Sequence, residues 1–242
     1  MYKRQVLNNS SKLVFNTISD DVYNEGTVNI KGDSVNPTII SMAVVPQTVN
    51  NSQTQIVLNS TFAGSGWYNI SNTQLNLGST GYIDYDTNLN LSNNVINLTS
   101  GSYLNLNTGD VLANNDFDIA RNSVVNYKAD VGVTDVDLAN TVKNTGLLNI
   151  GDGVLTDVSI NTLKSENGTI RIDVDNPNLK ADRIIINNRI YGITDVAFDN
   201  SQNLKLEVGD KIYFAQTQAE QSLDDYKFVS NATDGIYEIG ID

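Results

Sequence analysis

A three-residue pattern, one polar residue between two apolar residues, recurs along this chain at intervals close to 21 residues. The recurrences form three interleaved series that share this period. Repeats of this length are the sequence signature of solenoids, in which each repeat is one coil that packs on the next. The first series consists of Tyr68-Asn69-Ile70 and Leu89-Asn90-Leu91, the second of Leu75-Asn76-Leu77, Ile96-Asn97-Leu98 and Phe117-Asp118-Ile119, and the third of Ile83-Asp84-Tyr85, Leu104-Asn105-Leu106, Val125-Asn126-Tyr127, Leu148-Asn149-Ile150 and Ile170-Arg171-Ile172.

The spacing within a repeat fixes the type of coil. Successive triplets start 7, 8 and 6 residues apart, which leaves room for tight turns but not for helices. In a three-residue strand the two outer side chains point to one side and the central side chain to the other. We therefore predict an all-β fold, a right-handed parallel β-helix with three sides, apolar residues inside, and coils stacked at the strand spacing of about 4.8 Å.

Asparagine, which makes up about one residue in seven of this chain, is far more frequent than in an average domain. The predicted fold explains the excess. The central Asn of a triplet faces outward, where its amide can form a ladder with the next coil, and Asn residues at turns, such as Asn93 and Asn94, tolerate the left-handed conformation. An antiparallel sandwich also has short strands and Asn-rich turns, but it gives no reason for one period in three phases.

The repeat is weaker before residue 68. Val28-Asn29-Ile30 and Ile56-Val57-Leu58 are predicted to be strands of earlier coils. Residues 33–54 contain two of the three prolines and are predicted to form a loop or an irregular coil. We expect the sequence to begin partway along a longer solenoid.

The C-terminal third has a different pattern. From Gly168 onward asparagine is scarcer, and strand-like runs are separated by connections of hairpin length. Asn187-Asn188 is a candidate tight turn in this region. Because the end of a solenoid exposes strand edges and an open apolar core, a capping unit is required there. The sequence thus predicts a β-helical stalk over 1–167 and a β-rich cap over 168–242.

Residues 168–242 resemble the pertactin-like C-terminal segment of autotransporter passenger domains, the autochaperone region of type V secreted proteins. The resemblance is carried by an opening strand, a long stretch with a glycine inside its second strand, and two closing strands. Members of the family commonly close with an aromatic pair and a Trp, whereas Ile236, Tyr237 and Ile239 stand here. The four stretches read GTIRIDVD, ADRIIINNRIYGITDVAF, GDKIYFAQTQ and DGIYEIGID.

The resemblance implies a surface-displayed adhesin or virulence-type stalk, exported through the bacterial outer membrane and either anchored there or released. It implies two partners: a host cell-surface receptor or extracellular matrix, and the protein's own C-terminal β-barrel translocator. It further implies that the C-terminal module folds first and acts as a template for the coils behind it. Local contacts suit that order, since solenoid stability is a sum of nearest-neighbour interfaces.

Composition excludes several kinds of chemistry. The chain has no histidine and no cysteine, so Ser-His-Asp triads, cysteine nucleophiles, thiolate or imidazole zinc sites and disulfides are absent. The formal net charge is −13, and the sequence shows no basic stripe, so nucleic acid is not an expected partner. No apolar run reaches the length of a membrane helix, and we expect a soluble chain whose export signal or anchor lies outside it.

Three aspartate pairs are the candidates for acid–base chemistry or calcium binding, because each is predicted to place two carboxylates on one face of a strand. They are Asp84/Asp86, Asp116/Asp118 and Asp135/Asp137. The predicted series put Asp84 and Asp118 on different sheets, so these pairs assemble no cluster. We interpret them as solvated surface carboxylates and expect no catalytic residue, no cofactor-binding residue and no metal site.

Two further motifs receive structural interpretations. The only Trp, Trp67, follows Gly64 and Gly66; a turn leading into a strand explains this stretch as well as a sugar-stacking platform does. Ser65 lacks any recognisable base and is not a nucleophile. The N-x-S/T matches follow mostly from composition, and they include Asn59, Asn69, Asn90, Asn97, Asn167 and Asn231.

Two alternatives to the adhesin remain open. A β-helical toxin passenger has the same architecture. A solenoid carbohydrate-active enzyme requires a carboxylate cluster on one sheet, and on the grounds given above we expect that the protein is not an enzyme.

Overall fold

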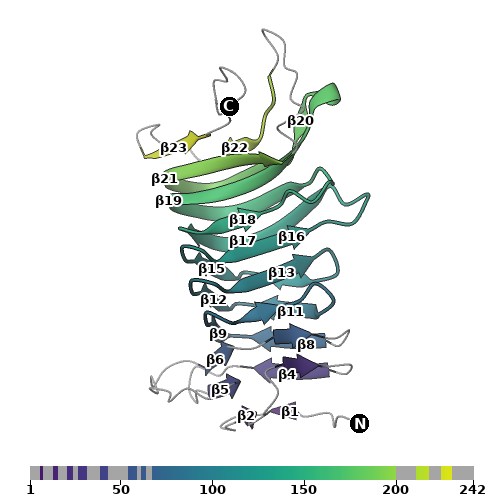
Figure 1. The fold of residues 1–242 in the computed structure, drawn as a ribbon, viewed down its shortest axis with the longest axis vertical. Coiled ribbons are helices and arrows are strands. Elements are labelled where there is room, and N and C mark those ends of the chain that lie inside the picture. Colours follow the sequence, from purple (N-terminus) through teal and green to yellow (C-terminus); the bar gives the residue numbers. More distant parts are fainter. Residues whose placement is uncertain are drawn as a thin grey trace.

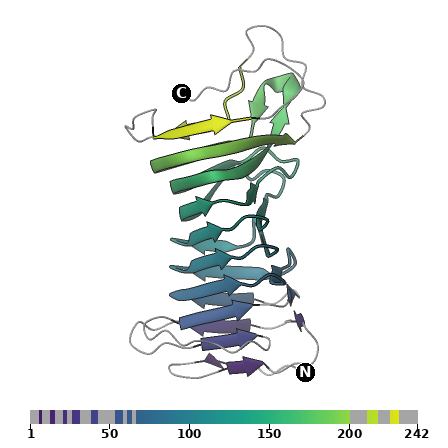
Figure 2. The same ribbon diagram turned by 60° about the vertical axis from the view of Figure 1, so that its left-hand side comes forward.

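The computed structural model describes residues 67–199, 211–217 and 225–230, and the backbone of seven strands that precede residue 67. The seven are β1 (Val6–Leu7), β2 (Leu13–Phe15), β3 (Asp21–Tyr23), β4 (Thr27–Lys31), β5 (Ile39–Met42), β6 (Thr54–Leu58) and β7 (Thr61–Ala63). The strands stack into a long column, with β1 to β4 toward one end and β21 to β23 at the other (Figures 1 and 2).

Three short strands make each of the first three coils after residue 66. Coil 1 is β8 (Trp67–Ser71), β9 (Thr73–Leu77) and β10 (Tyr82–Ile83). Coil 2 is β11 (Asn88–Ser92), β12 (Val95–Leu98) and β13 (Tyr103–Asn107). Coil 3 is β14 (Val111–Ala113), β15 (Asp116–Ile119) and β16 (Val124–Lys128).

The later coils are built from longer strands that bend around the corners. Coil 4 is β17 (Asp135–Asn144) and β18 (Leu147–Asn149), coil 5 is β19 (Asp157–Asp175), and coil 6 is β21 (Arg183–Asp199). A 3₁₀ turn, η1 (Asn176–Asn178), and β20 (Lys180–Ala181) connect coils 5 and 6. Beyond coil 6 lie β22 (Ala215–Thr217) and β23 (Tyr226–Val229).

The strands of successive coils pair in parallel and form three stacks, one for each side of the coil. Stack 1 contains β1, β4, β8, β11 and β14, followed by the first parts of β17, β19 and β21 and by β22; β14 and β17 are in contact. Stack 2 contains β2, β5, β6, β9, β12 and β15, followed by the later part of β17, the middle parts of β19 and β21, and β23. Stack 3 contains β3, β7, β10, β13, β16 and β18, followed by the last parts of β19 and β21.

The pairing register confirms the three-phase repeat. Asn69 pairs with Asn90, Leu75 with Ile96, and Leu104 with Val125. The result is a β-solenoid of about six turns with a spacing of about 22 residues. The predicted fold class, a parallel β-helix, is therefore confirmed, and an antiparallel sandwich is excluded over coils 1 to 6.

The core is a column of apolar side chains inside the coils. In coils 1 to 3 these side chains are the outer residues of the predicted triplets, which alternate with the outward residues as period 2 requires. Leu75, Ile96 and Leu104 are fully buried, and Phe117 is 2% exposed. The same alternation continues upward through Val142, Leu163 and Ile190 of stack 2.

The expectation of hairpin-like strands after Gly168 is wrong for the described residues. β19 runs through position 168 without interruption, and β21 pairs with it in parallel from Asp157↔Arg183 to Asp173↔Asp199. Asn187-Asn188 forms a corner between two sides of coil 6, at a register shift, and not a hairpin turn. The described antiparallel pairing is Val174↔Ala181 and Asp175↔Lys180, around η1.

The physical reason is that the corners of coils 5 and 6 are only one or two residues long. They carry no loop that marks a boundary, and the inserted η1 turn shifts the spacing from 21 to 26 residues, as in Val158↔Ile184. The division of the chain into a stalk over 1–167 and a separate capping module over 168–242 stays a prediction. The closing stretch 231–242 lies outside the described residues.

The strands expected before residue 68 are present. β4 contains Val28–Ile30 and pairs with β8, and β6 contains Ile56–Leu58 and pairs with β9. The segment 33–54, expected to be a loop or an irregular coil, includes a regular strand, β5, which pairs in parallel with β2 and β6. The remainder of that segment lies outside the described residues, apart from Thr54, which begins β6.

Candidate functional site: outward columns and corners of the coils

Outward asparagines form the hydrogen-bonded ladders that the sequence predicted. On stack 3, Asn126 Nδ2 donates to Asn105 Oδ1 at 2.7 Å, and Asn149 Nδ2 donates to Asn126 Oδ1 at 2.9 Å. On stack 2, Asn97 Nδ2 donates to Asn76 Oδ1 at 2.8 Å. These amides satisfy one another along the column, so they tie coils together and leave few of their groups for a ligand.

A second set of asparagines lies at the corner between stacks 1 and 2. Asn72, Asn93 and Asn114 have φ values of 52°, 54° and 54°, the left-handed conformation that Asn tolerates better than most residues. The expectation is confirmed for Asn93. It is wrong for Asn94, which is 1% exposed and points its amide into the coil, where Nδ2 donates to the carbonyl oxygen of Ile70 at 2.9 Å.

A row of buried aspartates, which the sequence analysis missed, follows the corner between stacks 3 and 1. Asp110 accepts hydrogen bonds from the backbone N–H groups of Asn107 and Leu89, at 2.7 and 2.8 Å. Asp152 accepts from the backbone N–H groups of Val154, at 2.8 Å, and of Ala129. Each carboxylate therefore joins a turn of its own coil to the coil below.

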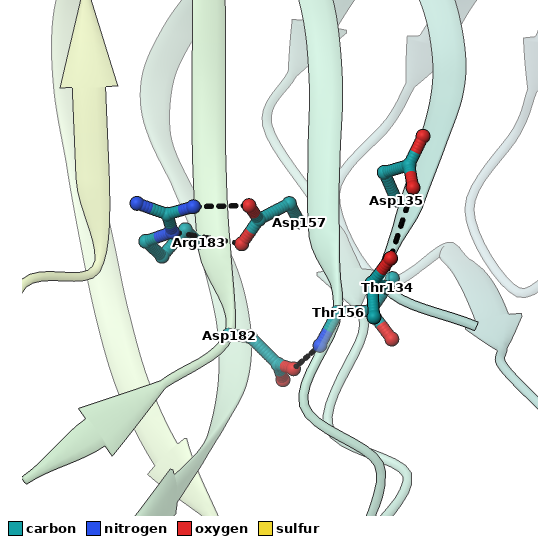
Figure 3. Close-up of polar contacts among 6 residues, drawn as sticks. All are labelled: Thr134, Asp135, Thr156, Asp157, Asp182 and Arg183. Carbon is teal, nitrogen blue, oxygen red and sulfur yellow. Dashed lines mark hydrogen bonds and ion pairs between the residues drawn. The ribbon is translucent and has the colours of Figure 1, made fainter. Parts of the chain in front are cut away.

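The row continues into coils 5 and 6. Asp173 accepts from the backbone N–H groups of Asp152, at 2.6 Å, and of Gly153. Asp182 accepts from the backbone N–H groups of Asp173 and Thr156, at 2.7 and 2.8 Å. Figure 3 shows Asp182 pointing toward Thr156. The interval from Asp152 to Asp173 equals the repeat length, so the period would have pointed to this pair.

Burial raises the pKa of these carboxyl groups. Asp182 is fully buried and Asp173 is 4% exposed. Desolvation raises the pKa of Asp182 to about 7, with a smaller contribution from the neighbouring charges of Asp173 and Asp152, although two backbone hydrogen bonds oppose the shift. Desolvation also raises the pKa of Asp173, and it raises that of Asp110 to about 6. The aspartate row is thus costly to keep ionised at neutral pH.

The three aspartate pairs singled out in the sequence are far apart in function and position. Asp84 and Asp86 lie in the turn after β10, not on a strand, and Asp84 accepts from the backbone N–H of Tyr85 at 2.7 Å. Asp116 accepts from Asn140 Nδ2 at 2.8 Å, and Asp118 forms an ion pair with Lys143 at 2.9 Å. These two lie on stack 2.

The third pair, Asp135 and Asp137, lies on stack 1. Asp135 accepts from Thr134 Oγ1 at 3.0 Å (Figure 3). Two coils further on in this stack, Arg183 donates from both Nε, at 2.8 Å, and an Nη atom to the carboxylate of Asp157. This bidentate pair uses the geometry that suits arginine and carboxylate.

What this arrangement can do chemically follows from the use of its oxygens. The buried aspartates hold backbone N–H groups, and several surface aspartates hold neighbouring side chains. Within 67–199, 211–217 and 225–230, no group of three or more Asp or Glu is arranged to hold a metal ion. The geometry is that of a scaffold with patterned outer faces.

The remaining sequence motifs fall on strands and corners. Trp67 begins β8 and is 38% exposed, as expected for a strand that follows a turn; Gly64, Ser65 and Gly66 lie outside the described residues. Among the N-x-S/T matches, Asn69, Asn90 and Asn97 lie within strands, and Asn167 lies exposed at a corner with φ 59°. Asn59 and Asn231 lie outside the described residues.

Comparison with protein-family models, with curated proteins and with solved structures gives no match. In the part of the chain that the structure describes, no helix has the length and apolar character needed to cross a membrane. The class of protein that the fold defines is a β-solenoid, and its function is argued from its faces and its architecture.

Proposed function

We propose that this chain is the C-terminal part of an autotransporter passenger. In this proposal it is a β-solenoid stalk that is displayed on a bacterial surface and binds host receptor or matrix components by its outer faces. The observation that supports the proposal best is the uninterrupted parallel solenoid leading into residues 168–198, the described part of the segment that resembles the autochaperone region.

The proposed activity is binding, not catalysis. A solenoid hydrolase needs two carboxylates free to act on one substrate bond. Here Asp116 and Asp118 are engaged by Asn140 and Lys143, and the buried aspartates hold backbone N–H groups. A flat, regular outer face is instead suited to contact with an extended partner.

The last coils are proposed to nucleate folding. β19 and β21 pair along almost the whole circumference of the coil, from residue 157 to residue 173. Above them, the ring of Phe214 packs edge-on against Phe198 and Phe228, with centroid distances of 6.1 and 5.6 Å. Such contacts gather apolar area at one end, and neighbouring coils can then add by nearest-neighbour contacts.

The display proposal is tested on the full-length gene product expressed in a Gram-negative host. A tag is inserted at Gly153, an exposed corner with φ 91° and open space around it, and intact cells are probed with a tag antibody before and after mild proteolysis. Surface labelling that proteolysis removes is expected. Labelling that appears only after cell lysis would reject display.

The folding proposal is tested by two matched substitutions in the core of stack 1, Ile186→Val in coil 6 and Ile70→Val in coil 1. Both isoleucines are 1% exposed, and each change costs about 1 kcal/mol. If coil 6 belongs to the nucleus, Ile186→Val slows refolding, whereas Ile70→Val mainly speeds unfolding. Stopped-flow refolding measures both rates, and the opposite assignment would reject the nucleating role.

A further inference from the structure

The stack 2 face of the upper coils carries a row of cations that the sequence analysis did not detect. The segments concerned are 141–144 of β17, 162–166 of β19, 189–193 of β21, and β23. Within them the charged residues are four cations and one acid, Glu166; the cations are Lys143, Lys164, Arg189 and Lys227. We call these four residues the cationic strip. The expectation that the chain has no basic stripe is therefore wrong for this face.

The strip places like charges on neighbouring strands. Lys143 and Lys164 are register partners on β17 and β19, and like charges directly opposite one another destabilise a sheet. Lys143 is compensated on its lower side by Asp118 at 2.9 Å. Lys164, which is exposed, has no hydrogen bond or ion pair with any other described residue. Its neighbours along the stack are Lys143 and Tyr191.

The upper end of the strip is exposed and has defined geometry. Arg189 lies on β21 beside Thr162, and its Nη1 donates to the hydroxyl of Tyr191 at 2.9 Å. Lys227 lies on β23 beside Ile193. The four cations span four stacked strands, which at the strand spacing is about 14 Å along the solenoid axis.

Stack 1 of the same coils shows the opposite arrangement. Its segments 135–139, 157–160, 183–186 and 215–217 carry three aspartates and one arginine, and that arginine is bound to Asp157. Charge is thus sorted between two sides of the same coils, with acids on one side and cations on the other. The net charge of −13 is screened within about 8 Å at physiological ionic strength, so the strip acts on a partner as a local positive surface.

We propose that the cationic strip binds a linear anionic polysaccharide, with sulfate or carboxylate groups spaced along the strip. A polyanion along this face would neutralise Lys164 and Arg189, whose charges the described part of the chain leaves without an acidic partner. A nucleic acid is a poorer match, because four cations neutralise few phosphates and most of that affinity comes from their number. The inference rests on the proposed role in host binding and names the class of partner.

The test measures binding of a heparin hexasaccharide to the whole chain by isothermal titration calorimetry at low and physiological salt. The variant Lys164→Gln/Arg189→Gln is compared with Arg121→Gln/Lys180→Gln. The control pair removes two exposed cations that lie off the strip, so both variants change the net charge equally. Circular dichroism confirms that each variant folds. We expect the strip variant to lose at least 10-fold in affinity and the control less than 2-fold.

Three outcomes would overturn the proposal: no saturable binding to the wild-type chain, equal losses in the two variants, or tighter strip-dependent binding of a single-stranded oligonucleotide. The last outcome would assign the strip to nucleic acid. None of these results bears on surface labelling of intact cells, so failure of the strip and failure of surface display are distinguishable.

Discussion

Asn94 and Asn115 occupy equivalent corners of consecutive coils, and the side chain of one completes the hydrogen bonding of the other. Asn115 Oδ1 accepts from both the backbone N–H and Nδ2 of Asn94, each at 3.1 Å. Asn115 Nδ2 in turn donates to the carbonyl oxygen of Leu91 at 3.0 Å. Both asparagines are buried. This pair shows how the solenoid satisfies the backbone groups that its turns release into the interior.

Removal of this interior amide is expected to be costly. Asn115→Ala leaves two donors of Asn94 and one acceptor of Leu91 without partners, so the free energy of unfolding falls by about 2–4 kcal/mol. The matched control is Asn97→Ala on the outer face, which loses one hydrogen bond to Asn76 where water can replace it; a loss below about 1 kcal/mol is expected. Urea denaturation measures both. Equal losses would show that the interior pair has no special weight.

Gly192 tests how closely the upper coils approach each other. It has φ 81°, and a Cβ built there would overlap the carbonyl oxygen of Ser165 in the coil below. Gly192→Ala therefore combines backbone strain with a steric clash and should cost about 3 kcal/mol or more. Gly153→Ala is the control, because φ is 91° but nothing lies within 4 Å; it should cost about 1–2 kcal/mol. Thermal unfolding of the two variants checks the difference.

The asparagine ladder on stack 3 ends at an acceptor without a donor. Asn149 Oδ1 is buried and has no hydrogen bond, and its register partner in the next coil is Arg171. Arg171→Asn places an amide at that position, where Nδ2 can donate as Asn149 and Asn126 do below. A gain in the free energy of unfolding of up to about 1 kcal/mol is expected. Arg171→Ala supplies no donor, so a similar gain in that variant would contradict the ladder argument.

The aspartate row predicts that acidification stabilises the fold. The pKa of Asp182 is about 7 in the folded chain and near its ordinary value when unfolded. The folded chain then binds the proton more tightly, so stability rises as pH falls from about 7 toward about 4 and is lost as pH rises through about 7. The free energy of unfolding should be greater at pH 5 than at pH 8, by about 2 kcal/mol from this residue.

The residue responsible is identified by substitution. In Asp182→Asn the difference between pH 5 and pH 8 should shrink, because the titrating group is gone. Asp137→Asn, an exposed aspartate of stack 1, removes the same charge at the surface and should leave the difference unchanged. Urea titrations at the two pH values give the four numbers needed. An unaltered pH difference in Asp182→Asn would contradict the assignment.

The sequence by itself determined the solenoid. Apolar residues at period 2 within a strand and at period 21 between strands can be buried together only if strands stack in parallel, so the triplets predicted the core from Leu75 to Ile172. The outward ladder of Asn105, Asn126 and Asn149 followed from the same two periods. Local alternation and a constant repeat were sufficient because every contact lies between neighbouring coils.

Only the tertiary structure decided where the polar groups of the corners point and which charges meet on one face. Asn93 and Asn94 are adjacent in sequence, yet one adopts a left-handed turn outside and the other is buried inside. Lys143, Lys164 and Arg189 share a face although 21 and 25 residues separate them. Their proximity depends on corner lengths that change from coil to coil, and those lengths depend on how tightly each turn packs on the coil below, which local sequence does not encode.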